Sequence, residues 1–362
     1  MADEPKPLLS RRLLLFFLLV PVSVGVWAVS APAVAIFAVA GLAIIPLAFV
    51  MGIATEELGK HAGPGLGGLL NATFGNATEL IIALVALANG LVVVVQASIT
   101  GSIIGNILLV LGLSMLAGGV RRPKQTFNRA AAGLQVTMLT LAVIGLVMPE
   151  LYNLFVFGTG PPSPSVPVED MSVLISAILI VAYIAGLVFS LRTHRDVFNP
   201  VTTKEDPPRW SVRTSFAALG LATALVAVES EILVHALEGA IAQIGLKELF
   251  VGVVVVAIIG NAAEHGASVQ MAWRNKMELS VGICTSSSTQ IALFVAPVLV
   301  FASALMGPPR LTLGFEPFEL VSIALSVAVL SLIASDGESN WYEGVLLVMV
   351  YAIIAVGFFF HP

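Results

Sequence analysis

The sequence predicts a helical protein that crosses a membrane many times. Of the 362 residues, 58% are hydrophobic and only 11% are charged, and the mean hydropathy is +1.00, well outside the composition of a soluble domain. Most stretches between polar breaks are apolar runs of about 20 residues, the length that a helix needs to cross a bilayer. The alternating polarity of lipid-facing barrel strands is missing. We therefore expect an all-α polytopic membrane protein.

The apolar runs and the turn signals between them predict about 11 transmembrane helices. The predicted spans lie near residues 13–29, 32–53, 66–88, 91–118, 130–149, 171–191, 213–235, 249–273, 279–305, 317–334 and 343–360. The first run follows Arg11 and Arg12, as a signal peptide would, but it leads straight into another long span. We interpret it as a retained helix.

The basic residues are divided unevenly between the two sides of the membrane. If the amino terminus is cytoplasmic, only Lys247 and Arg310 of the 17 lysines and arginines fall on the far side. Because lysine and arginine concentrate in cytoplasmic loops, this distribution predicts a multi-pass protein with a cytoplasmic N-terminus. The compact termini favour a prokaryotic plasma membrane. No basic stretch with interleaved aromatic residues suggests a nucleic-acid partner.

The two halves of the chain repeat one pattern. GNATE at 75–79 matches GNAAE at 260–264, and 22 residues past each glutamate come Gly101-Ser102 and Ser286-Ser287. Matching spans are five apart, so the two copies must cross the membrane in opposite directions, as in the inverted repeats of many transporters. The predicted domains are an N-terminal tail with an extra helix (1–31), a first five-helix repeat (32–191), a cytoplasmic linker (192–212) and a second five-helix repeat (213–362).

The repeated glutamates predict a cation site. Glu79 and Glu264 lie inside hydrophobic spans, where an ionised carboxylate costs a few kcal/mol. A bound divalent cation offsets that cost, and oxygen-rich surroundings suit calcium. Asn76 and Asn261 each precede their glutamate by three residues, so they share a helix face with it. We predict that these four side chains bind the ion.

Flexible backbone and further polar side chains complete the predicted site. Gly75 and Gly260 allow each helix to break and to expose carbonyl oxygens where they line a cavity. The other predicted ligands are Ser102, Ser287 and Gln290.

The same carboxylates predict proton coupling. A buried glutamate takes up a proton when no cation is bound, and an arriving cation must displace that proton. Competition of this kind for one site produces antiport. His265, next to Glu264, is a second candidate for proton transfer, with a packing role as the alternative.

Further acidic residues occur near the ends of the second and seventh spans. Glu56 and Glu231 occupy similar places in the two repeats, and we predict that they guide ions to the site together with Ser286. Glu57 and Glu238 are interpreted as solvated helix ends. The single cysteine, Cys284, is interpreted as structural.

No zinc-protease, serine-hydrolase or phosphate-binding motif occurs, so neither enzymatic activity nor a resident cofactor is expected. The expected partners are calcium, protons and the lipid bilayer. A homo-oligomer is compatible with the sequence.

Four segments resemble the calcium/proton exchanger family of the cation/calcium antiporter superfamily. They are GNATELIIALVALANG (75–90), GSIIGN (101–106), GNAAEHGASV (260–269) and SSSTQIALFVAP (286–297). The resemblance covers nearly the whole chain. It implies a ten-helix core of two inverted repeats plus one N-terminal helix, and calcium leaving the cytosol in exchange for protons. It also implies that Glu79 and Glu264 are the principal residues, and that manganese or other divalent ions are further candidates for the cargo.

Two departures from the family pattern are apparent. The first repeat has Gly105 where the second has Gln290, so fewer side-chain ligands are expected from the fourth span. The linker has only Glu205 and Asp206 close together, whereas eukaryotic relatives carry an acidic helix there, so regulation through such a helix is not expected.

Two other functions remain as alternatives. A sodium/calcium exchanger would need additional oxygen ligands for sodium, whereas His265 after the second glutamate fits proton coupling better. A passive divalent-cation channel would use the glutamates as a selectivity ring, but the inverted repeat favours alternating access.

Overall fold

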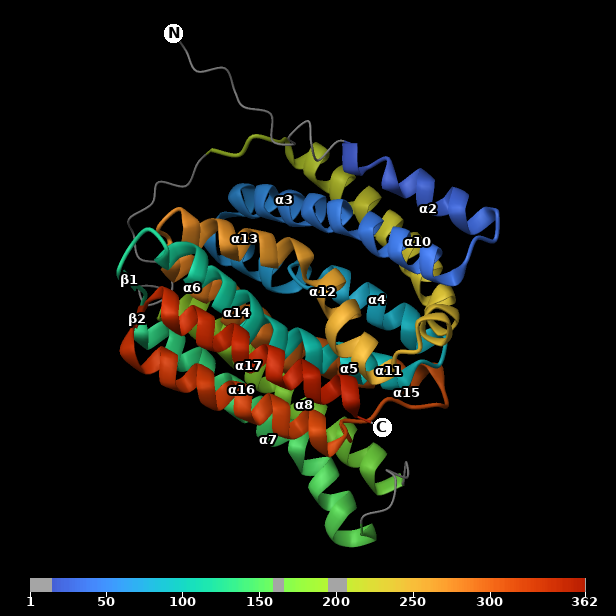
Figure 1. Cartoon of the computed structure of the whole chain (residues 1–362). Helices are drawn as coiled ribbons and strands as arrows, with labels where there is room; N and C mark the ends of the chain where they lie inside the picture. Colours follow the sequence, from blue (N-terminus) through green and yellow to red (C-terminus); the bar gives the residue numbers. More distant parts are fainter. Residues whose placement is uncertain (1–14, 159–165, 195–206, 362) are drawn as a thin grey trace. The chain divides into compact units, whose positions relative to one another are not determined.

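The fold is described from a computed structural model, which covers residues 15–158, 166–194 and 207–361. Within these ranges helices are joined by turns and loops, and two short strands, β1 (Gln125–Thr126) and β2 (Glu338–Ser339), pair antiparallel with Gln125 opposite Ser339 (Figure 1). The prediction of an all-α protein is confirmed. Glu205 and Asp206 of the linker lie outside the described residues.

The described residues form two compact units. Unit 1 contains residues 15–82 and 207–245, and unit 2 contains 83–158, 166–194 and 246–361. Each unit therefore takes residues from both predicted repeats. A sequence repeat reflects duplication whereas a compact unit reflects packing, so the predicted domain boundaries stay a prediction.

Unit 1 consists of α2 (Leu19–Ala28), α3 (Ala33–Phe74), α10 (Val212–Ile244) and the first residues of α4 (Ala77–Ala88). Helices α3 and α10 pack along each other. Their shared core contains Leu47, Met51 and Ala54 of α3 and Leu219, Ala222 and Val226 of α10. At Gly63 the backbone of α3 leaves the helical region (φ 80°, ψ 171°), which interrupts the helix.

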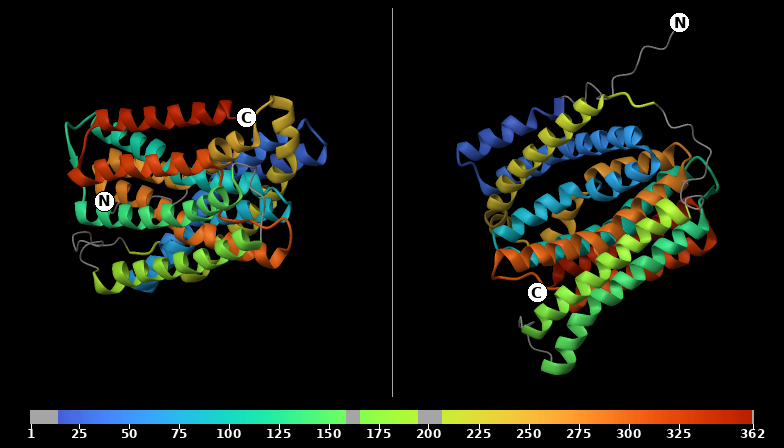
Figure 2. Two further views of the ribbon diagram at one scale, coloured as in Figure 1. Left: turned by 90° about the horizontal axis from the view of Figure 1, so that it is seen from below. Right: turned by 180° about the vertical axis from the view of Figure 1, so that it is seen from behind.

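Unit 2 contains the rest of α4 and most of the other helices. Its further elements are α5 (Val92–Ile104), η1 (Gly105–Val110), α6 (Leu111–Gly119), α7 (Arg129–Phe157), α8 (Val166–Val188), η2 (Phe189–Thr193), α11 (Glu248–Phe250), η3 (Val251–Val256), α12 (Ala257–Gly260), α13 (Ala262–Trp273), α14 (Met277–Gln290), η4 (Ile291–Val295), α15 (Ala296–Met306), α16 (Pro317–Asp336) and α17 (Trp341–Phe360). The segments marked η are π-helical. Helices α16 and α17 pack against α7 and α6, respectively (Figures 1 and 2).

Local sequence explains several helix starts. The Asn128 side chain accepts hydrogen bonds from the backbone N–H groups of Ala130 and Ala131 at the start of α7. Asn340 caps α17, and the Glu343 side chain accepts a hydrogen bond from the Asn340 backbone N–H. Glu316 and Glu319 form the same arrangement at the start of α16. Such capping boxes satisfy backbone donors that the first helical turn leaves open.

Eight described helices are long and apolar enough to cross a membrane, or nine if one bent pair counts as a single span. Each of the 11 predicted spans falls on helix, but α2 and α4 are only 10 and 12 residues long. The helices continue well past three predicted span ends, from 53 to Gly63, from 149 to Val156 and from 235 to Ile244. Charged residues that suggested loops there lie on these helices instead.

The helices break at both repeated motifs. Helix α3 ends at Phe74 and α4 begins at Ala77, while α12 ends at Gly260 and α13 begins at Ala262. The α11–α12 segment and α13 are bent by 64° from each other. The breaks expected from Gly75 and Gly260 are thus present.

A π-helical turn follows each of the downstream serine motifs. Segment η1 begins at Gly105, shortly after Ser102, and η4 begins at Ile291, shortly after Ser287. Such turns are uncommon and occur often at functional sites. Their matched positions add to the similarity of the two sequence halves.

Candidate functional site

Asn261, at the bend between α12 and α13, is the centre of a buried hydrogen-bond network in unit 2. Its Nδ2 donates to Ser102 Oγ at 2.8 Å and to the Ala257 carbonyl at 2.8 Å. Asn106 Nδ2 donates to Asn261 Oδ1 at 3.1 Å and to Ser287 Oγ at 2.9 Å. The four polar side chains are each at most 3% exposed. The network therefore gathers amide and hydroxyl oxygens from α5, η1, the bend and α14.

Glycine allows these segments to approach one another. A Cβ atom on Gly101 would overlap the carbonyl of Val253, and a Cβ on Gly252 would come within 2.5 Å of Ala97 Cβ. Only glycine at these two positions fits so close a contact between α5 and η3. The contact brings Ser102, the next residue after Gly101, to Asn261.

Asn106 is the functional candidate that the sequence analysis missed. It follows Gly105, the position at which the first repeat lacks the counterpart of Gln290. The expected shortage of side-chain ligands in the fourth span is thus partly offset by an amide one residue later. An asparagine inside an apolar span is itself a signal, because a buried amide is costly without hydrogen-bond partners.

The two glutamates follow the helix breaks directly. Glu79 lies in the first turn of α4 in unit 1 and is 7% exposed, and Glu264 lies in the first turn of α13 in unit 2 and is half-buried. The backbone N–H groups and the dipole at a helix N-terminus favour a negative charge there. Asn76 is buried in unit 1 with 3% exposure.

The other predicted residues lie in α14. Gln290, the last residue of α14, is half-buried. Ser286 is also half-buried, and its hydroxyl donates to the Ile283 carbonyl at 3.4 Å. Ser287 therefore belongs to the Asn261 network, whereas the Ser286 hydroxyl bonds to the backbone of its own helix.

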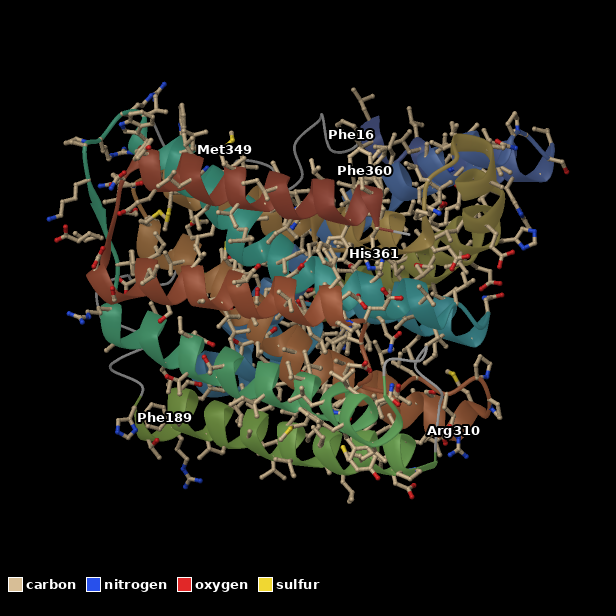
Figure 3. All side chains as sticks on the ribbon, turned by 60° about the horizontal axis from the view of Figure 1, so that its bottom comes forward. Phe16, Phe189, Arg310, Met349, Phe360 and His361 are labelled. Atoms are coloured by element: carbon tan, nitrogen blue, oxygen red, sulfur yellow. The ribbon has the colours of Figure 1, made fainter. Side chains whose placement is uncertain are left out.

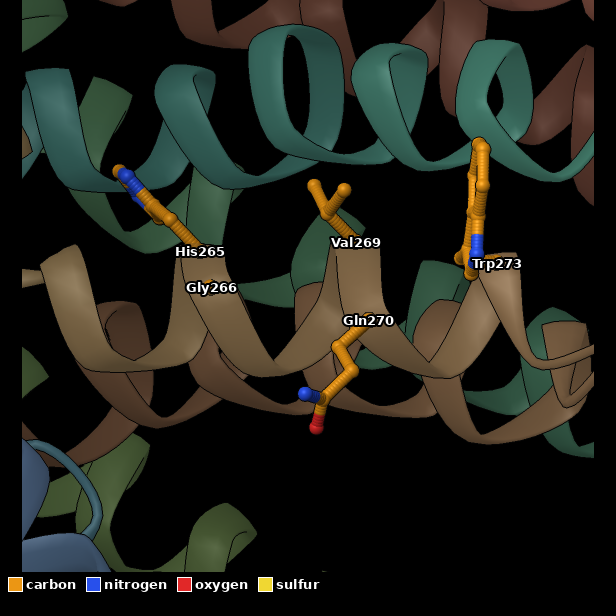
Figure 4. A pocket seen from close by; sticks show the side chains of 5 residues that line it. All are labelled: His265, Gly266, Val269, Gln270 and Trp273. Carbon is orange, nitrogen blue, oxygen red and sulfur yellow. The ribbon is translucent and has the colours of Figure 1, made fainter. Parts of the chain in front are cut away.

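His265 faces an open groove along α13. The groove has a volume of about 580 Å³ and is lined by His265, Gly266, Val269, Gln270 and Trp273. Figure 4 shows that the side chains of His265, Val269 and Trp273 point to the same side of the helix, whereas Gln270 points away from them. The imidazole is therefore positioned next to open space, one residue after Glu264.

The acidic residues of α3 and α10 have different surroundings. Glu56 is 67% exposed and pairs with Lys60 at 2.8 Å, and Glu231 and Glu238 are exposed. Glu57 was wrongly interpreted as solvated, since it is 1% exposed and pairs with Lys60 at 2.7 Å. Its other oxygen accepts the backbone N–H groups of residues 209 and 210. These donors stand 152 and 153 residues away in the sequence, so local pattern did not reveal them.

Cys284 belongs to a buried polar cluster in unit 2. Its sulfur lies 3.1 Å from Ser268 Oγ, which also contacts Ser280 Oγ at 2.8 Å and Ser114 Oγ at 2.9 Å. The cluster joins α6, α13 and α14. This arrangement fits the structural role expected of the cysteine.

Three arginines of unit 2 make specific contacts. Arg122 donates to the Trp273 carbonyl at 3.3 Å, and the Arg121 guanidinium stacks on the Trp273 ring at 4.0 Å. Arg310 pairs with Glu169 at 2.9 Å. Figure 3 shows Phe189 and Arg310 at opposite ends of α8.

The profile of the family described as "Sodium/calcium exchanger protein" matches residues 32–192 and 214–360. The chain belongs to this family. A protein named Ca(2+)/H(+) antiporter from Aphanothece halophytica is 46% identical over 91% of this chain and 91% of its own length. The Ca(2+)/H(+) antiporter ChaA of Bacillus subtilis is 45% identical over 95% of this chain and 99% of its own length.

Solved structures show the same fold. The structure of YfkE, described as a Ca2+/H+ antiporter protein, matches with a TM-score of 0.82 and 41% identity over 96% of this chain and 100% of that one. The H+/Ca2+ exchanger CAX matches with a TM-score of 0.72 at 13% identity over 96% of this chain and 91% of that one, which supports the fold alone.

Proposed function

We propose that this multi-pass membrane protein is a secondary antiporter that moves calcium out of the cytosol in exchange for protons. The relatives named as Ca(2+)/H(+) antiporters support this function at 45–46% identity across nearly the whole chain. The observation that carries the proposal is the buried network of Asn261, Ser102, Asn106 and Ser287 beside a helix break that begins the Glu264 helix. Oxygen atoms gathered at a break in a membrane helix are suited to a hard cation.

In the proposed site, Glu79 and Glu264 bind calcium or protons in competition. Two carboxylates neutralise a divalent ion, and amide, hydroxyl and carbonyl oxygens complete its shell. The oxygens come from Asn76, Asn261, Ser102, Ser287 and Gln290 and from the backbone of Gly75 and Gly260. Without calcium, protons neutralise the carboxylates instead. Acidic conditions should therefore weaken calcium binding, because protons occupy the same oxygens.

Transport by alternating access is part of the proposal. The matched breaks at Gly75 and Gly260 and the matched π-helical turns η1 and η4 support two inverted five-helix repeats after one extra helix, with 11 spans in all. Glu56, Glu231 and Ser286 would attract ions along the access routes. His265 would exchange protons with the open groove beside it.

We place the protein in a prokaryotic plasma membrane with its N-terminus in the cytoplasm. The bacterial relatives and the distribution of basic residues support this assignment. Calcium is the cargo, with manganese as a further candidate, and no resident cofactor or catalytic reaction is proposed. Assembly as a homo-oligomer is compatible with this function.

Purified protein in proteoliposomes tests the proposal. An imposed proton gradient should drive calcium uptake, and calcium addition should move protons in the opposite direction. A sodium gradient of the same size should drive little uptake, which separates this function from sodium/calcium exchange. Calcium flux that is insensitive to the proton gradient would overturn the proposal and favour a channel.

A further inference from the structure

Glu229 is a fully buried carboxylate in unit 1. It lies in the middle of α10 and is 0% exposed. Neither of its carboxylate oxygens makes a hydrogen bond within the described part of the chain. Ser23 of α2, also 0% exposed, interacts with the carboxylate through its hydroxyl without reaching standard hydrogen-bond geometry. A buried polar group of this kind requires an explanation.

Two other buried carboxylates have partners that Glu229 lacks. Glu57 pairs with Lys60 and accepts two backbone N–H groups. Glu319 accepts the Thr100 hydroxyl at 2.8 Å and the Glu316 backbone N–H at 3.1 Å. Among the residues that the structure describes, Glu229 has neither a cation nor a backbone donor. A buried site without such partners suits the neutral form of a carboxyl group better than the ionised form.

The ionisable residues on the neighbouring helices do not supply a counter-charge. Helix α2 has no charged residue between Leu19 and Ala28. On α3, Lys60 is held by Glu56 and Glu57, and His61 contacts the Trp210 carbonyl at 2.7 Å. The other ionisable residues in the same part of α10 are Glu231, His235 and Glu238, all exposed.

An ionised carboxylate in such a place would cost a few kcal/mol, so a bound proton is the simplest way to remove the charge. We propose that Glu229 and Ser23 form a second protonation site, apart from the exchange pair, and that the bound proton stabilises the packing of α2 on α10. The neutral carboxyl group can donate a hydrogen bond to the Ser23 hydroxyl. Loss of the proton leaves an unpaired charge between the two helices.

This site gives unit 1 a pH dependence that does not rely on the exchange function. Unfolding exposes Glu229 to water, where the carboxyl group ionises more readily, so unfolding of the wild type at mildly acidic pH releases a proton. Stability should therefore fall as the pH rises. Glu229→Gln keeps the shape and the neutral state, and should remove this contribution.

Infrared spectroscopy of the purified full chain in lipid nanodiscs tests the protonation state directly. The wild type at mildly acidic pH should show a C=O stretching band of a protonated carboxylic acid that is absent from Glu229→Gln. Glu238→Gln, an exposed change on the same helix, should leave the band intact. The proposal is overturned if Glu229→Gln and the wild type show the same band intensity.

Two further measurements test the role of the proton. The melting temperature of the wild type should fall more steeply between mildly acidic and neutral pH than that of Glu229→Gln, and equal slopes would contradict the stabilising role. Ser23→Ala should shift the frequency of the Glu229 band, because it removes the hydrogen-bond partner. An unshifted band would rule out Ser23 as that partner.

Discussion

The two repeated motifs have similar sequences but different surroundings. In unit 2, the break at GNAAE places Asn261 in a network with Ser102 and Asn106. In unit 1, the residues that follow Asn76 in GNATE lie against an apolar core. Ala77 belongs to the core of α3 and α10, and the Thr78 hydroxyl donates to the sulfur of Met51 at 3.7 Å. The motif sets the position of each break, whereas the packing around it sets the chemistry of each half.

This difference suggests separate contributions to the proposed exchange. The hydrogen bonds around Asn261 hold polar groups in place before an ion arrives, which lowers the cost of binding. Glu79 is 7% exposed and lies beside an apolar core, where a bound ion or proton would neutralise its charge. The following changes test how far the second motif relies on its network.

The largest effect is expected from Asn261→Ala. The change removes the partner of Ser102 and of Asn106, and each buried polar group left unsatisfied costs about 1–3 kcal/mol. Calcium/proton exchange in proteoliposomes should fall by about 100-fold, since about 1.4 kcal/mol corresponds to a factor of ten. Asn89→Ala, which removes an exposed amide bonded to its own helix, is the control and should exchange normally. Equal rates in the two variants would contradict the role of the network.

Gly101→Ala should be the next most damaging change. The added methyl group overlaps the Val253 carbonyl, so α5 and η3 must separate, and overpacking of this kind costs about 1–3 kcal/mol. A lower melting temperature of the purified protein should accompany weaker calcium binding. Gly282→Ala adds a methyl group to a helical glycine with no atom within 4 Å and serves as the matched control. A Gly101→Ala protein as stable as this control would show that the close contact is unimportant.

Asn106→Ala should have a moderate effect. It removes the bridge between Asn261 and Ser287 but leaves the bond from Asn261 to Ser102. We expect the apparent affinity for calcium to fall by about tenfold with a smaller change in maximal rate, because one hydrogen bond contributes about 1 kcal/mol. Calcium titration of exchange separates the two quantities. An unchanged affinity would remove Asn106 from the site.

The smallest effect is expected from Glu56→Gln. Its salt bridge with Lys60 is exposed, and pairs of this kind contribute about 0–1 kcal/mol. Exchange should slow by about two- to threefold at low ionic strength, if Glu56 attracts calcium, and the difference should shrink in high salt. A loss that persists in high salt would indicate a direct ligand rather than an access residue.

The sequence predicted the features that depend on local pattern. Long apolar runs predicted the helices, and the glycines at 75 and 260 predicted the breaks. The bonds of Asn106 to Asn261 and Ser287 join positions 155 and 181 residues apart, so they depend on packing that no local pattern describes. The same holds for Glu57, because the two backbone N–H groups that it accepts lie at residues 209 and 210, near the end of the predicted linker. Glu229 is a related case, because it lies in the interior of α10, whose extent beyond residue 235 the local pattern did not predict.

The most direct test of the central claim is calcium-coupled proton movement in Glu79→Gln and Glu264→Gln proteins reconstituted in liposomes. Each variant should insert and keep its helical content, because glutamine resembles the protonated side chain. Each should lose both calcium uptake and the matching proton flux to the level of empty liposomes. Exchange at the wild-type rate in either variant would contradict the proposal that calcium and protons compete for this pair of glutamates.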